Sequence, residues 1–159
     1  MSLSVSQAVW LAPAVTAVHF LEERSRFANW ARRHISNRYT DEHWRRIHAL
    51  GMLSAIGFAA LVSWAPRPLT VFLFTSLYLA PMLFNLAFHA GASFWCRSYS
   101  PGLISAFALF PLLFWYLTSG FAGARLLHTE VGMAATATGA ILHSLDLAST
   151  TFFVTRPSE

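Results

Sequence analysis

Three acid–base side chains lie within five residues near the start of the chain. His19 is followed three and four residues later by Glu22 and Glu23, so in a helix the imidazole and both carboxylates flank one face. They close an apolar run that begins at about Ala8. Such groups at the end of a membrane-length segment are costly unless they are paired, bind a metal or face a wet cavity. The chemistry expected here is therefore acid–base or metal-assisted.

The composition predicts the kind of element that positions these groups. Hydrophobic residues make up 55% of the 159 residues and charged residues only 11%, which lies outside the usual range of soluble domains. Several apolar runs approach or exceed the roughly 20 residues that cross a bilayer as a helix. We therefore expect an all-α polytopic membrane protein, a single domain over residues 1–159 with about five transmembrane helices in one bundle. The expected spans are 7–28, 47–64, 69–95, 103–121 and 131–154.

The distribution of arginines predicts the orientation of this bundle. The segment 24–46, which covers the end of the first span and the loop after it, is rich in them: Arg24, Arg26, Arg32, Arg33, Arg38, Arg45 and Arg46. By the positive-inside rule this loop is cytoplasmic and the N-terminus is outside. Most of the formal charge of +4 lies in this loop, so we expect membrane lipids and no nucleic acid as partners. The expected location is a bacterial cytoplasmic membrane, with the oligomeric state left open.

Alternation of the spans brings distant polar residues to one membrane depth. His48, at the start of the second span, and His89, near the end of the third, fall on the same side as His19. Polar residues also recur on one face of two spans, and such stripes point into a bundle because lipid offers no hydrogen-bond partners. The third span has Tyr78, Asn85, His89 and Cys96, and the fifth has Thr136, His143, Asp146 and Thr150. We expect a polar pocket between spans one, three and five, with span two nearby.

These positions give a set of candidate site residues. The candidate catalytic residues are His19, Glu22, Glu23 and His89. The candidate substrate-binding residues are Asn85, Tyr99, Tyr78 and His143. The candidate metal ligands are His19, Glu22, Glu23 and His89, with His48 and His143 as alternatives. Mixed nitrogen and oxygen donors suit one or two divalent ions of zinc or iron. Without a metal, a glutamate would donate a proton and a histidine accept one; both mechanisms stay open, because the chain lacks a dedicated ligand spacing such as HExxH.

Three motifs in order carry a family resemblance. They are His19-Phe20-Leu21-Glu22-Glu23, the membrane histidine His89 after Asn85, and Tyr99-Ser100-Pro101-Gly102. Together they resemble the HXXEE family, which is named for its HxxEE motif and marked by a second histidine and a YxPG motif. The resemblance extends from the first span to the start of the fourth, and His89 rather than His143 is taken as the second histidine. It implies a site at these residues and no particular reaction.

The leading functional hypothesis is a small membrane enzyme that acts on a lipophilic substrate from the bilayer. The pocket lies among apolar helices and its polar groups are acid–base types, which suits isomerisation, cyclisation or hydrolysis, with or without a bound metal. A proton-coupled carrier and a non-catalytic assembly subunit are the alternatives. A purely structural interpretation pairs Glu22 with Arg26 and Glu23 with headgroups or another arginine. It accounts for the carboxylates but leaves His19 unexplained.

Overall fold

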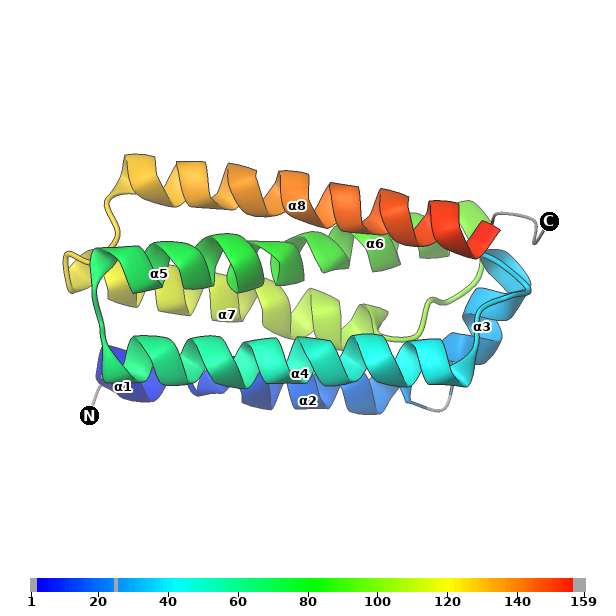
Figure 1. Ribbon diagram of the computed structural model, residues 1–159, viewed down its shortest axis with the longest axis horizontal. Helices are drawn as coiled ribbons and strands as arrows, with labels where there is room; N and C mark the ends of the chain where they lie inside the picture. The colour runs from blue at the N-terminus through cyan, green and yellow to red at the C-terminus, as the bar shows by residue number, and fades with distance from the viewer. Residues whose placement is uncertain (1–2, 25, 156–159) are drawn as a thin grey trace.

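The computed structural model describes the backbone of residues 3–24 and 26–155, and the side chains of residues 3–24 and 26–145. Every regular element in these ranges is helical, which confirms the all-α prediction. The elements are α1 (Val5–Ala8), α2 (Leu11–Glu23), α3 (Phe27–His34), α4 (Asp41–Trp64), α5 (Pro68–Phe74), the π-helix η1 (Thr75–Leu79), α6 (Ala80–Cys96), α7 (Leu103–Gly123) and α8 (Thr129–Thr155). Figure 1 shows α1–α2, α4, α5–η1–α6, α7 and α8 side by side, each antiparallel to the one before.

Three of these helices are long and apolar enough to cross a membrane. They are α4, the continuous rod Pro68–Cys96 and α7, with 24, 29 and 21 residues. Trp64 and Trp95 end α4 and α6 with their indole rings exposed, as tryptophans do at a membrane interface. These features support membrane association. The helix α2 has only 13 residues, and the five expected spans remain a prediction.

The helix boundaries follow local sequence signals. The Thr40 hydroxyl accepts a hydrogen bond from the backbone N–H of His43 at 3.0 Å, and Asp41 and Glu42 lie in the first turn of α4. Capping and the helix dipole favour this arrangement. The helix therefore begins at Asp41, well before the apolar run that was expected to start at residue 47. At the other end of the loop that follows α4, Pro68 occupies the first turn of α5, where its missing N–H costs nothing.

The first expected span, 7–28, is interrupted. The helix α2 ends at Glu23, and α3 begins at Phe27 and lies across the end of the bundle where α2 ends and α4 begins (Figure 1). The buried residues Phe27, Trp30 and Ala31 make the inner side of α3, which packs with Tyr39. Arg32 donates to the backbone carbonyl of Tyr39 at 3.2 Å. The helix α3 is thus amphipathic and covers one end of the bundle with its apolar side.

The rod between Pro68 and Cys96 contains one widened turn. The π-helix Thr75–Leu79 comes just before Pro81. A proline has no N–H, and its ring conflicts with the carbonyl of residue i−4, so a π turn relieves the clash within a continuous helix. Tyr78 of this turn is buried, and its hydroxyl contacts Thr16 of α2.

The bundle has an apolar end and a polar end. The core of the apolar end is made of large buried side chains, among them Val9, Val62, Phe74, Leu117 and Phe121. Buried polar residues lie mainly towards the end covered by α3, among them His19, Glu23, His89, Ser100 and Ser105. That polar end holds the candidate site.

Candidate functional site

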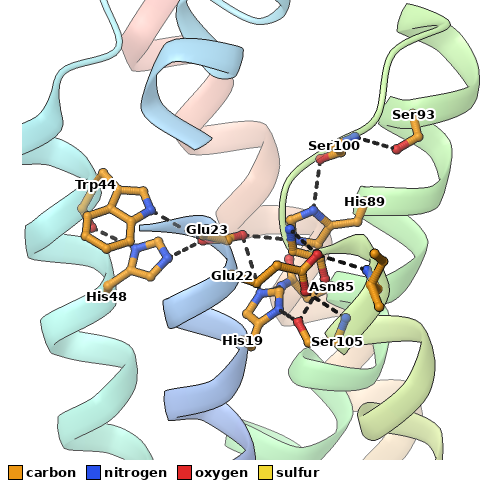
Figure 2. A network of polar contacts seen from close by, with 12 residues as sticks. His19, Glu22, Glu23, Trp44, His48, Asn85, His89, Ser93, Ser100 and Ser105 are labelled. Carbon is orange, nitrogen blue, oxygen red and sulfur yellow. Dashed lines mark hydrogen bonds and ion pairs between the residues drawn. The ribbon is translucent and has the colours of Figure 1, made fainter. Parts of the chain in front are cut away.

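Glu23 lies at the centre of a buried polar cluster below α3. Its Oε1 atom lies 3.4 Å from Nε2 of His19 and 3.1 Å from Nε2 of His89. Its Oε2 atom contacts Nε2 of His48 and lies 3.4 Å from the indole nitrogen of Trp44. Figure 2 shows the three imidazoles reaching Glu23 from α2, α4 and α6. We call His19, Glu23, His48 and His89 the His/Glu cluster. These are the histidines that span alternation places at one depth.

Each imidazole of the cluster is also held at its other nitrogen. These bonds aim all three Nε2 atoms at the carboxylate, which is the usual arrangement of metal-ligating histidines and their supporting groups. The Nδ1 contacts are His19 to Ser105 Oγ at 2.9 Å, His89 to Ser100 Oγ at 2.9 Å, and His48 to the backbone carbonyl of Trp44 at 2.7 Å.

The partner of His48 determines where its proton lies. A carbonyl oxygen only accepts, so Nδ1 of His48 carries the hydrogen that bonds to Trp44. A neutral His48 would then turn a bare lone pair towards Oε2 of Glu23, two acceptors in direct contact. The contact becomes favourable when a second proton lies on the His48–Glu23 pair. A proton shared by His48 and Glu23 would therefore satisfy both atoms.

The hydrogen bonds around His19 also determine which of its two nitrogens carries the hydrogen. The Ser105 hydroxyl donates to the Gly102 carbonyl at 3.2 Å, so Ser105 Oγ accepts from Nδ1–H of His19. The Asn85 amide nitrogen lies 3.3 Å from Nε2 of His19 and donates to it in that tautomer. The Nε2 lone pair then faces Oε1 of Glu23 at 3.4 Å. A cation between these two atoms would make both of them ligands.

His19, Glu23 and His89 form a group that could hold a metal ion. One ligand atom from each residue lies within 4.8 Å of the other two, and the three residues are only 1–3% exposed. Two imidazoles and a carboxylate suit zinc or iron. His48 touches the carboxylate through its other oxygen and is a neighbour of this group.

Glu22 faces a different partner, the first turn of α7. Its Oε1 accepts from the backbone N–H groups of Gly102 and Ile104, both at 3.2 Å, and its Oε2 accepts from that of Ser105 at 2.8 Å. The Tyr99 hydroxyl donates to the same carboxylate. Burial and this hydrogen bond raise the pKa of Tyr99 to about 12, so it stays a donor at neutral pH. The structure thus places both residues at the α7 N-terminus, where a carboxylate satisfies orphan N–H groups.

The turn Tyr99–Gly102 closes over the His/Glu cluster. Gly102 has φ +99°, a left-handed conformation that glycine adopts at little cost. A Cβ atom here would lie 2.7 Å from Cε1 of His19, 2.8 Å from Oε1 of Glu23 and 2.8 Å from Cε1 of His89. The backbone at Gly102 therefore forms one wall of the site.

A cavity of about 460 Å³ adjoins the cluster. Three residues expected to bind substrate line it, namely Tyr78, Asn85 and His143. Cys96, from the stripe on the third span, packs instead against the buried residues of α3 and Tyr39. Thr136 donates to the Gly132 carbonyl of its own helix. The side chains of Asp146 and Thr150 lie outside the described residues.

Sequence reasoning missed three residues that support the cluster. Ser100 and Ser105 hold two of the imidazoles, and Trp44 holds the third through its carbonyl. Ser100 lies inside the YxPG motif, of which only Tyr99 was taken as a candidate site residue. The spacing of Ser105 from Gly102 places it in the first turn of the next helix, but only the fold shows that this turn abuts α2.

Comparison with known proteins identifies the family. Residues 10–116 match the family described as "Protein of unknown function with HXXEE motif". The chain belongs to this family. The matched region contains the whole His/Glu cluster and the turn Tyr99–Gly102. The HXXEE motif is thus divided between two tasks, because His19 and Glu23 lie in the cluster while Glu22 caps α7. No curated protein and no solved structure matches the chain.

Proposed function

We propose that this HXXEE protein is a membrane-embedded enzyme that uses one bound zinc or iron ion to act on a lipophilic substrate. The proposed ligands are His19, Glu23 and His89, and His48 is the proposed proton donor or acceptor. Isomerisation, cyclisation or hydrolysis would all use this combination. The proposal places five spans in the membrane, with the arginine-rich α3 end in the cytoplasm.

One observation carries the proposal. Imidazole nitrogens from α2 and α6 converge on a single buried carboxylate, and the hydroxyls of Ser105 and Ser100 hold both rings in that orientation. A metal ion between them would be coordinated by the Nε2 lone pairs of His19 and His89 and by the carboxylate of Glu23. Two histidines and one glutamate leave a fourth position open, as in catalytic zinc sites.

The neighbouring residues suit a reaction that moves protons. A zinc or iron ion at this site would polarise a substrate oxygen or activate a bound water. His48 lines the cavity and also touches Glu23, so a proton shared by that pair would lie beside any molecule in the cavity. Phe27 and Tyr39 line the same cavity at the α3 end of the bundle and would limit the access of bulk water to it.

The metal content of the purified protein tests the proposal. The protein is extracted in detergent without chelator, and the bound metals are measured by mass spectrometry. We expect about one zinc or iron ion per chain. H89A and E23Q should each lose most of it, because each removes one of three ligands. H128A is the matched control, since His128 is an exposed residue outside the cluster, and it should keep the wild-type content.

Other outcomes would select a different function. Wild-type protein that stays metal-free after incubation with zinc and with ferrous iron would exclude the metal. Glu23 would then be held by N–H donors alone. Uptake of protons with a solute into vesicles, abolished in E23Q, would favour a carrier. Loss of a larger complex in H89A, with the metal retained, would favour an assembly subunit.

A further inference from the structure

We infer that the ligand of this site is a lipid with one hydrocarbon chain and an oxygen-bearing head, which enters sideways between α4 and α8. This inference rests on the proposed function, because the head is assigned to the His/Glu cluster.

The cavity opens on the side of the bundle. Ile47 and Ser54 of α4 and Leu77 of η1 line it and are also exposed, Ile47 by 41% and Leu77 by 45%. The helix α4 packs on α2 and α5, whereas α8 packs on η1 and α6. Figure 1 shows α4 and α8 on opposite sides of the α5–η1–α6 rod. In a membrane this opening would face acyl chains.

The cavity is elongated and limited in volume. His89 and Leu77 both line it and belong to one continuous helical rod. At 1.5 Å per residue they are separated by roughly 15–18 Å along that rod. The volume of about 460 Å³ lies within the roughly 300–1,000 Å³ typical of small-molecule sites. One extended chain fits these dimensions, whereas a phospholipid with two chains does not.

The polar groups that could bind a ligand lie at one end of the cavity. The His/Glu cluster and Asn85 form that end. Towards the middle, Thr16 and Tyr78 bond to one another, and both lie within reach of the Ala12 carbonyl, so their hydrogen bonds are made inside the protein. Apart from Ser54 at the exposed rim and His143 of α8, the rest of the wall is largely apolar and includes Phe20, Ile47, Leu77, Met82, Phe88 and Phe110.

This distribution fixes the orientation of the ligand. An oxygen of the head lies at the cluster, where it would fill the open coordination position, and the chain extends along α4 and η1 towards the opening. A hydrocarbon without a head would leave the polar end unsatisfied.

Photo-crosslinking tests the inference. The probe is a long-chain fatty alcohol with a diazirine in its chain, added to protein in phosphatidylcholine nanodiscs. We expect crosslinks in segments 47–54 and 77–82. A probe of the same chain without the hydroxyl should label these segments at least fivefold less. Equal labelling by both probes would overturn the assignment of the head to the cluster.

Two substitutions that narrow the cavity sharpen the test. Gly51 lines the cavity, and a Cβ there would lie 3.0 Å from the ring of Phe20, so G51F should reduce labelling at least fivefold. S54F should do the same from the exposed rim without altering the core. G57F is the matched control on α4, because nothing lies within 4 Å of a Cβ at Gly57. Labelling that is unchanged in G51F and S54F would overturn the inference.

The metal content of the same samples separates this inference from the proposed function. Wild-type metal content with lost labelling in G51F would support both proposals. Metal without specific labelling in the wild type would overturn only the ligand. Specific labelling in a wild-type protein that holds no metal would overturn the metal and retain the cavity as a lipid site.

Discussion

At two glycines of this bundle, Gly102 and Gly139, another part of the chain comes too close for a side chain to fit. The neighbours of Gly102 are polar side chains, whereas those of Gly139 belong to a packed helix. A Cβ atom at Gly102 would meet side-chain atoms of His19, Glu23 and His89. A Cβ atom at Gly139 of α8 would lie 2.4 Å from Cβ of Ala80 and 2.7 Å from the carbonyl of Ser76. The first approach builds a polar site, whereas the second brings two helices together. Only the first lies within residues 10–116, the region that matches the family.

This difference suggests which part of the molecule is tied to the function. At Gly102 the requirement is set by three side chains that must face one another, so a small displacement disturbs all of them. At Gly139 the requirement is set by how closely α8 lies on η1 and α6. We expect displacement there to cost packing energy and to leave the cluster between α2, α4 and α6 intact.

The largest expected effect is that of G102A. The added methyl group would enter a space bounded by the two imidazoles and the carboxylate, and the left-handed conformation adds strain. We expect a loss of about 3 kcal/mol in unfolding free energy and loss of the bound metal. Thermal unfolding in detergent and metal analysis measure these effects. The control is G120A, in the helix α7 that follows Gly102, because nothing lies within 4 Å of a Cβ at Gly120. Both quantities should stay near wild type in G120A, and equal damage there would refute the role of Gly102.

G139A should have a smaller effect of a different kind. The methyl group must push α8 away from the backbone of η1, which costs about 1–2 kcal/mol after the gain in helix propensity. Metal content should not change, in contrast to G102A. The control G132A has its nearest neighbour at 3.5 Å and should unfold like wild type. If G139A released the metal, the two regions would be coupled, and the comparison above would be wrong.

The smallest effect on the fold is expected for S100A and S105A. Each removes the hydroxyl that holds one imidazole, and groups of this kind typically contribute 10–100-fold to metal affinity. We expect about a tenfold loss for each, measured by competition with a chelator, with little change in thermal unfolding. S144A is the control, because Ser144 bonds only to its own helix backbone in the described contacts. Unchanged affinity in both variants would show that these serines do not orient the ligands.

The depth of the cluster residues was predictable, and their partners were not. Helical periodicity and the alternation of spans suffice to put His19, His48 and His89 at one level. The partner of Glu22 could not be predicted, because it consists of the backbone N–H groups of α7. Backbone groups leave no trace in a side-chain pattern. Tyr99, a candidate for binding substrate, is one of the donors to Glu22.

The end of the first helix was also beyond local sequence reasoning. The expected first span continued to residue 28, past the end of α2 at Glu23. The chain turns after Glu23 because α3 buries Phe27, Trp30 and Ala31 against Tyr39, which lies beyond the next turn of the chain. That contact depends on tertiary structure.

The π-helix at Thr75–Leu79 also determines which way the later part of its rod faces. One extra residue in a turn rotates everything after it by roughly 100° relative to an uninterrupted α-helix. Val71 and Phe74 before the turn are thereby free to face the apolar core, while Asn85 and His89 after it face the cluster. A single residue deleted from this turn would swing the second histidine of the family away from Glu23 without changing any residue of the motifs themselves.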